Sequence, residues 1–247
     1  MTRRLVALLR LPVDDYLAAL DVFLRGISVP SGLAALLAAL ACWWIYLPVH
    51  ELLHALGCVA GGGSVTRLEI DAIYGAAWLQ RLFPFVAVGS AYAGQLTGFD
   101  TGGSDLTYLL TDALPYALTI LLGVPLLRAA GRRHPGVGQA ALFGAALPLA
   151  LVPFGALAGD YYEMGSIIVS RLTALVVTDF PLERWRGDDL PLLIETLAGQ
   201  GLSGLDVLGL SLSTLLGGAL AFLTYAAGVA WSRLLETAPS ATSASPR

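Results

Sequence analysis

The chain has 247 residues, of which 56% are hydrophobic and 13% are charged, and its formal net charge is −4. A soluble domain is about one quarter charged, so this composition excludes an ordinary soluble globular protein and indicates an integral membrane protein. Acidic residues outnumber basic ones, which gives no reason to expect nucleic acid as a partner. We therefore predict an all-α polytopic membrane protein with a single membrane-embedded domain over residues 1–236.

Residues 1–28 are predicted to form an amphipathic helix at the membrane interface. Apolar residues such as Leu17 and Leu24 recur at helical spacing, while charged residues such as Asp14 fall at other positions. Asp14 also interrupts the apolar stretch that a signal peptide needs. At the other terminus, residues 237–247 are small and polar, which is typical of a disordered tail.

Four later segments are apolar over enough residues to cross a bilayer, which takes about 20 residues in a helix. They cover residues 31–59, 106–130, 137–159 and 205–235, and the third could continue to residue 168. Arginines cluster before the first span, between the second and third, and after the fourth. Four crossings put all three clusters on one side, so the positive-inside rule predicts a cytoplasmic N-terminus, in a bacterial inner membrane.

Two stretches between the first and second spans do not fit a spanning helix. Residues 65–73 alternate loosely between apolar and polar side chains, with glycines on both sides, which favours a short β-hairpin or an edge strand. Residues 82–99 are apolar but short, and they contain Pro84. A fifth crossing there would move the 132–133 arginine pair outside, so we predict a re-entrant or interfacial segment beside a cavity.

Residues 179–201, between the third and fourth spans, mix charged and apolar side chains. They could form an amphipathic outer helix that covers the site, but the favoured interpretation is a solvated connector. Arg184 and Arg186 fall on the outer side in this topology, which goes against the positive-inside rule.

Residues 49–57, VHELLHALG, carry the strongest chemical pattern of the chain, at the end of the first predicted span. His50 and His54 are four residues apart, so both imidazoles lie on one face of a helix and can reach one Zn²⁺. Glu51 lies beside them, where a carboxylate can act as a general base toward water. The competing interpretation is a histidine pair hydrogen-bonded in the bundle core, with Glu51 paired to an arginine.

A catalytic zinc ion needs a third protein ligand and an open position for water. Cys58 continues the histidine face, but three side chains stacked along one straight helix spread over about 12 Å and do not converge, so Cys58 is predicted to pack. The candidates on other helices are Asp160, Glu163 and Asp112. Asp160 is favoured because it lies as deep in its span as the histidines do in theirs. Glu163 could be a ligand or a supporting group, and Asp112 could cap its helix.

With these residues, the chain resembles the site-2 protease family of intramembrane zinc metalloproteases. His50, Glu51 and His54 match the family's first motif, and ALGCVAGGGSV after them looks like the small-residue run that follows it. VTRLEIDAIYG falls where the family has a membrane-associated β-hairpin, and Asp160 matches the aspartate two spans later. The resemblance implies Zn²⁺ on His50, His54 and Asp160, with Glu51 as the catalytic base.

The resemblance further implies a catalytic core within residues 31–170 and a membrane protein or peptide as substrate, in contact with the lipid bilayer. The chain has no asparagine, so the amide that stabilises an oxyanion in the family would be absent or would be replaced by Gln95, Tyr161 or Tyr162. Three functions stay open: a zinc endopeptidase that cleaves in or near a transmembrane segment, a zinc hydrolase of a lipid-type substrate, and a scaffold or subunit with a structural zinc ion or none. The oligomeric state is not predicted.

Overall fold

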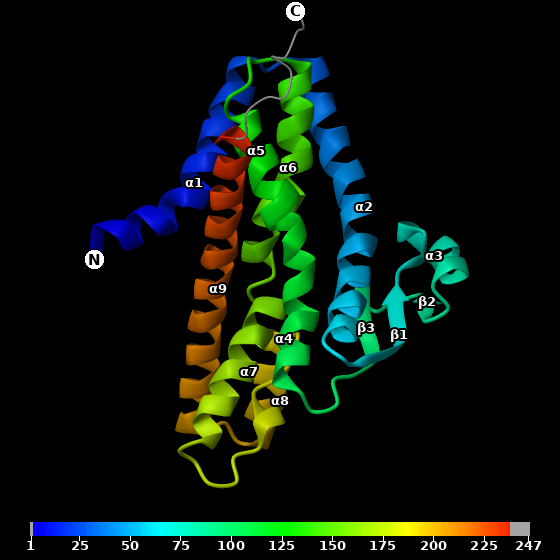
Figure 1. Cartoon of the computed structure of the whole chain (residues 1–247), viewed down its shortest axis with the longest axis vertical. Coiled ribbons are helices and arrows are strands. Elements are labelled where there is room, and N and C mark those ends of the chain that lie inside the picture. Colours follow the sequence, from blue (N-terminus) through cyan, green and yellow to red (C-terminus); the bar gives the residue numbers. More distant parts are fainter. Residues whose placement is uncertain (1, 238–247) are drawn as a thin grey trace, which may run out of the picture.

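The computed structural model describes residues 2–237 and consists mainly of long helices that lie side by side, with one small sheet beside helix α2 (Figure 1). Four helical segments are long and apolar enough to cross a membrane. The prediction of an all-α polytopic membrane protein is therefore confirmed, with the expected small β element near the histidine motif. The predicted tail falls outside the described residues except for Thr237.

The four spans agree with the predicted ones to within a few residues, except at the third. The first is α2 (Val29–Ala60) and the fourth is α9 (Gly204–Thr237). The second runs over Asp105–Ala130 and the third over Val137–Ala174. The third thus includes the continuation that the sequence left open.

Prolines divide the second and third spans into shorter helices. The second consists of α4 (Asp105–Ala113), a 3-10 turn at Leu114–Tyr116, a π-helical turn at Thr119–Gly123 and α5 (Val124–Ala130). The third consists of α6 (Val137–Gly155) and α7 (Asp160–Ala174). Proline lacks a backbone N–H and its ring blocks the carbonyl of the preceding turn, so helices bend or end near Pro115 and Pro153. The break before α7 places Asp160 at the first position of that helix.

Helix α1 (Thr2–Arg25) confirms the predicted N-terminal helix, and its C-terminal half packs along the bundle. Ala19 is fully buried among side chains of α5 and α6. Asp15 forms an ion pair with Arg128 of α5. Leu20 and Phe23 of the predicted apolar face pack against the same cluster, whereas Leu17 and Leu24 are about half exposed.

Three segments lie at one end of the molecule, the upper end in Figure 1, whereas the N-terminal half of α1 runs down and away from that end. The turn between α1 and α2, the loop between α5 and α6 and the end of α9 meet there. Arg132 of that loop forms an ion pair with Glu236 near the end of α9. Which side of a membrane this end faces stays a prediction.

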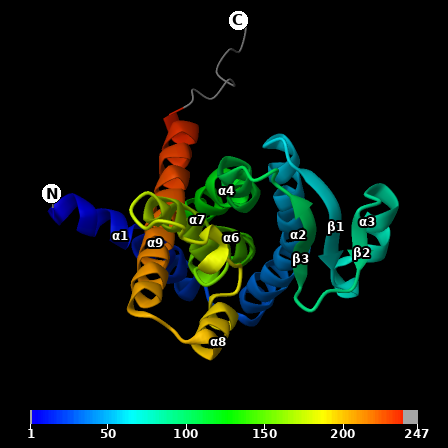
Figure 2. The same ribbon diagram turned by 90° about the horizontal axis from the view of Figure 1, so that it is seen from below.

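Three short strands form a sheet in the order β2-β1-β3. The strands are β1 (Ser64–Ile70), β2 (Val86–Val88) and β3 (Gly94–Asp100), and α3 (Ala76–Leu82) lies between β1 and β2 in the chain. Strand β1 pairs in parallel with β2 and antiparallel with β3. Leu68 and Ile70 of β1 are buried with Leu79 of α3. Figure 2 shows β3 beside α2, so one edge of the sheet faces the bundle.

The sheet corrects one detail of the sequence interpretation. Residues 65–73 supply one strand and a 3-10 turn instead of a hairpin or an edge strand, because β1 is central and both its partners come from later in the chain. Residues 82–99 form β2, most of β3 and the turn between them, and their expected re-entrant or interfacial position stays a prediction. Local alternation identifies a strand but carries no information about its partner, since strand pairing is set by tertiary packing.

The segment predicted to be a solvated connector, residues 179–201, is instead packed against the bundle. It contains a 3-10 turn at Leu182–Arg184 and helix α8 (Leu190–Gln200). Trp185 between them is 1% exposed, and its indole N–H donates to Asp206 of α9. One large aromatic side chain thus anchors the segment, which the alternation of charged and apolar residues does not reveal.

The two arginines that oppose the positive-inside rule form ion pairs within the protein. Arg184 pairs with Asp206 of α9, and Arg186 pairs with Asp105 at the start of α4. Arg128 and Arg132 near the other end are paired as well, so pairing does not distinguish the two ends.

Candidate metal centre

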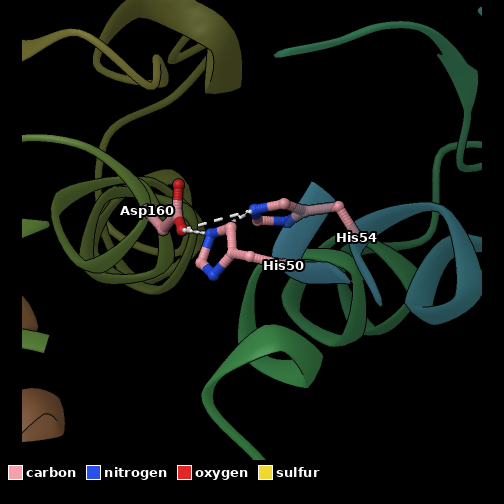
Figure 3. A group of neighbouring side chains, drawn as sticks. All are labelled: His50, His54 and Asp160. Atoms are coloured by element: carbon pink, nitrogen blue, oxygen red, sulfur yellow. Dashed lines mark hydrogen bonds and ion pairs between the residues drawn. The ribbon is translucent and has the colours of Figure 1, made fainter. Parts of the chain in front are cut away.

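Three side chains from two helices meet inside the bundle, where α2 approaches the start of α7 (Figure 3). Nε2 of His50 lies 3.1 Å from Nε2 of His54, and Oδ2 of Asp160 lies 3.4 Å from each of these nitrogens. A tetrahedral zinc ion with bonds of about 2.0–2.1 Å holds its ligand atoms about 3.3–3.4 Å apart. The three atoms therefore have the spacing of one face of such a tetrahedron, and the group could hold a metal ion.

The positions of the two helices explain why these side chains meet. Both histidines lie on one face of α2 because they are four residues apart. His50 lies 21 residues after Val29, where α2 begins, and Asp160 lies 23 residues after Val137, where the third span begins. The match in depth favoured Asp160 in the sequence, and the structure brings that carboxylate to the histidines.

The backbone of α4 fixes the ring of His54. The carbonyl oxygen of Thr111 lies 2.9 Å from Nδ1 of His54, and because a carbonyl can only accept, Nδ1 carries the proton and Nε2 presents a lone pair to the centre. Helix α4 comes this close because Gly57 faces it: a Cβ at Gly57 would collide with the carbonyl oxygen of Leu110. The crossing of α2 and α4 thus decides which nitrogen of His54 faces the centre.

Tyrosine hydroxyls orient the other two ligands. The hydroxyl of Tyr46 lies 2.6 Å from Nδ1 of His50, and the hydroxyl of Tyr116 donates to Oδ2 of Asp160 over 2.7 Å. With both Nδ1 atoms engaged outside the centre, the two Nε2 atoms and one carboxylate oxygen converge on one point. Such electron pairs repel one another unless a proton or a metal ion lies between them. The donor set therefore fits a divalent metal that accepts imidazole and carboxylate ligands.

Glu51 lies next to the centre without joining it. Its side chain is buried and lines the same cavity as the histidines. Gly94, at the start of β3, lies directly against it, since a Cβ there would be 2.5 Å from Cγ and 2.8 Å from Cδ of Glu51. Within residues 2–237 no arginine forms an ion pair with Glu51, so the alternative of a buried Glu–Arg pair gains no support.

A cavity of about 390 Å³ opens in front of the three ligands. Its walls come from α2, β3, α4, α7 and the loop before α8. Gln95 of β3 donates to Asp188 of that loop over 3.0 Å, and the Tyr92 hydroxyl donates to Asp189 over 3.0 Å. The hydrogen bond to Asp189 raises the pKa of Tyr92 above its ordinary value. Two segments that are far apart in the sequence therefore meet at the edge of the cavity.

Glu163 and Asp112, the other two candidate ligands, line the cavity but lie outside the group of three. Glu163 accepts a hydrogen bond from the hydroxyl of Tyr108 on α4. Asp112 does not cap its helix, because it lies near the end of α4, and the side chain of Ser104 caps the start. The cap that the sequence allowed for Asp112 is therefore wrong.

Several other side chains considered from the sequence take roles outside the centre. Gln95 lines the cavity, but the hydroxyl of Tyr161 donates to a threonine of α9 and that of Tyr162 donates to a backbone carbonyl in the segment before α8. Neither tyrosine hydroxyl is therefore free to replace the family's amide. Cys58 is buried, and its thiol faces the carbonyl of Ser64, which confirms the predicted packing role.

Sequence reasoning missed Tyr46, Tyr116 and Gly94, which contact the ligands or Glu51. Tyr46 precedes His50 by four residues, so helical spacing alone could have placed it on the same face. Tyr116 comes from a 3-10 turn and Gly94 from a strand edge. Both lie near the centre because distant segments pack together, so their positions cannot be predicted from local residue spacing.

Comparison of the chain with protein-family models, with curated proteins and with solved structures gives no match. The resemblance to site-2 proteases therefore rests on the motif residues alone. Any function has to be argued from the chemistry of the site, because a fold by itself does not determine function.

Proposed function

We propose that this chain is a membrane-embedded zinc-dependent endopeptidase that hydrolyses a peptide bond in or near a transmembrane segment. The observation that carries the proposal is the convergence of His50, His54 and Asp160 at tetrahedral spacing, with Glu51 on the wall of the same cavity. Ionisable side chains are costly inside a membrane, so four of them at one point favour a functional site. The same residues carry the resemblance to site-2 proteases.

The chemistry follows from the donor set and the base. When bound, Zn²⁺ would lower the pKa of a water molecule and polarise the scissile carbonyl. Glu51 accepts a proton as the water oxygen bonds to the carbonyl carbon, and it returns a proton to the amine nitrogen as the C–N bond breaks. Tyr46 and Tyr116 keep His50 and Asp160 oriented, so that the ligand geometry survives each cycle.

Strand β3 favours a peptide over a lipid as the substrate. It is an outer strand, hydrogen-bonded to β1 alone within the sheet, and its residues 94–97 line the cavity. A strand edge offers backbone N–H and C=O groups to an extended peptide, whereas an acyl chain gains nothing from them. Glu51 lies against the first residue of this strand, so a peptide held there would pass the base.

We also infer that the end of the bundle with the loop between α5 and α6 faces the cytoplasm of a bacterium. The N-terminus would then lie on the cytoplasmic side of the inner membrane. His54 lies six residues, or about 9 Å along the helix, before the end of α2. The metal centre then lies toward the outer side of the membrane. A substrate segment would reach it from that side or from within the bilayer.

The proposal is tested by replacing the base while keeping the metal ligands. We expect Glu51→Gln to lower the rate of cleavage about 10²- to 10⁴-fold, because the amide cannot accept the proton. Bound zinc should be unchanged, since Glu51 is not a ligand. The cleavage rate is measured with fluorescently labelled casein and the purified protein in detergent. Bound zinc is measured by plasma mass spectrometry. Glu195→Gln on the exposed face of α8 is the matched control.

The same measurements separate the other two functions. An undiminished cleavage rate in Glu51→Gln would contradict the role of the base. Zinc-loaded protein that cleaves no peptide but releases fatty acid from lipid vesicles would indicate a lipid hydrolase. Protein that binds no zinc under non-chelating conditions would favour a scaffold or subunit.

A further inference from the structure

The cavity in front of the metal centre is lined by more carboxylates than the proposed reaction uses. Besides Glu51 and Asp160, three acidic side chains line it: Asp112, Glu163 and Asp188. Among the described residues, no arginine lines this cavity, and the chain contains no lysine. Even a bound Zn²⁺ supplies two positive charges against five carboxyl groups. The surplus points to a cation that arrives from outside the chain.

Helix geometry brings two of these carboxylates toward each other. Asp112 follows Tyr108 by one turn on α4, and Glu163 follows Asp160 by one turn on α7. Helices α4 and α7 pack together, and the Tyr108 hydroxyl hydrogen-bonds Glu163 across the contact. Asp112 and Glu163 therefore form an acidic wall beside the metal ligands.

Asp112 is the side chain that lacks a partner. It is 4% exposed and lines the cavity, and its side chain takes part in no hydrogen bond or ion pair within the described part of the chain. A buried carboxylate without a partner is costly and is normally found paired with a cation or a donor. Arg186, next to Gly187 of the cavity wall, pairs with Asp105 and Glu183 instead.

We infer that Asp112 and Glu163 form a binding subsite for an organic cation of the substrate, an ammonium or guanidinium group carried by the peptide. A second metal ion fits less well, because within residues 2–237 only His50, His54 and Asp160 form a group of at least three ligands with atoms within 4.8 Å of one another. An organic cation needs no such convergence, since its several N–H donors reach separate carboxylates.

The distance between this subsite and the metal centre predicts which residue of the peptide carries the bound cation. Glu163 lies three residues after Asp160, which is about 4.5 Å along the axis. Residues of an extended peptide are about 3.3 Å apart. The cation therefore belongs to a residue within about two positions of the scissile bond. This assignment rests on the proposed endopeptidase function, whereas the binding of a cation in the cavity does not.

The test compares three short peptides in binding to the full-length protein in detergent, by fluorescence anisotropy. The first has blocked termini and a central lysine, and the second replaces the lysine by norleucine, which has similar length and no charge. The third contains norleucine and a free N-terminus. We expect the lysine peptide to bind at least about tenfold more tightly than the blocked norleucine peptide, which corresponds to about 1.4 kcal/mol. The preference should weaken as salt is added, because charge–charge attraction is screened.

Two variants locate the preference. Asp112→Asn combined with Glu163→Gln keeps side-chain volume and should bring the two blocked peptides to equal affinity, while Glu195→Gln should leave their ratio unchanged. Equal affinities in the unaltered protein, which need no variant to fold, would overturn the subsite. So would a full lysine preference in the double variant, or a second bound metal ion per chain that the double variant loses.

The third peptide separates the two sources of the cation. Tight binding of the free N-terminus alone assigns the α-ammonium group, and tight binding of lysine alone assigns a side chain; either result supports the subsite. Zinc content and casein cleavage are measured on the same preparation. A lysine preference without zinc or cleavage would leave the cation subsite standing and remove the endopeptidase proposal.

Discussion

Two regions of this molecule bury charged groups between membrane helices, and they differ in charge balance. Toward the end of the bundle with the loop between α5 and α6, Asp15 of α1 pairs with Arg128 of α5 at 2.9 Å and also accepts from the Tyr225 hydroxyl of α9. At the metal centre, two histidines and Asp160 face one another, and the surrounding carboxylates have no cation from the described residues. A balanced pair holds helices together, whereas an unbalanced cluster is prepared for a ligand from outside.

The largest effect on stability is expected in the balanced region. Arg128→Met keeps a long apolar stem but leaves Asp15 without its cation, so we expect the free energy of unfolding to fall by about 3 kcal/mol. Denaturant unfolding of the purified protein in detergent measures it. Bound zinc per folded chain should not change, because Arg128 lies away from the cavity. A loss of zinc without a loss of stability would show that the two regions are not separate in function.

The next largest effect is expected where the sheet touches the base. Gly94→Ala introduces a Cβ that collides with Glu51, so the carboxylate must shift. A displacement of about 1 Å costs about 10²-fold in rate, and we expect that loss in kcat/KM with zinc retained. Gly218→Ala is the matched control, because a Cβ at Gly218 meets nothing within 4 Å. Equal activities of the two variants would show that β3 does not position Glu51.

A pair of tyrosine variants gives the finest comparison of the two regions. Tyr116→Phe removes the hydroxyl that donates to Asp160, and loss of such a partner lowers metal affinity about 10- to 100-fold. Tyr225→Phe removes one hydroxyl from Asp15 in the other region and should leave zinc affinity unchanged. Competition with a zinc chelator measures both. If both variants bind zinc like the unaltered protein, the hydroxyl of Tyr116 does not support the ligand.

The spans and the histidine face could be predicted from the sequence because both are local patterns. Length and hydropathy define a spanning helix, and a spacing of four residues fixes which side chains share a face. Asp160 was favoured by counting its depth, which works because both helices cross the same bilayer. The break before α7 was not predicted, although Pro153 and Gly155 lie just before it.

What could not be predicted depends on contacts between distant segments. The alternation in 65–73 indicated a strand, but the partners of β1 begin at Val86 and Gly94, which no local pattern identifies. The segment before α8 looked solvated because Trp185 is one residue among charges, and its burial against α9 appears only in the fold. The hydrogen bonds from His54 to Thr111 and from Tyr116 to Asp160 also depend on contacts between distant segments.

We propose that His50, His54 and Asp160 together hold one zinc ion. The most direct test is the zinc content of the full-length protein, purified without chelators, for the unaltered chain and for His54→Ala, with Tyr225→Phe as the folded control. We expect about one zinc ion per chain in the unaltered protein and the control, and almost none in His54→Ala. Absence of zinc from the unaltered protein, or equal zinc in His54→Ala, would contradict the proposal.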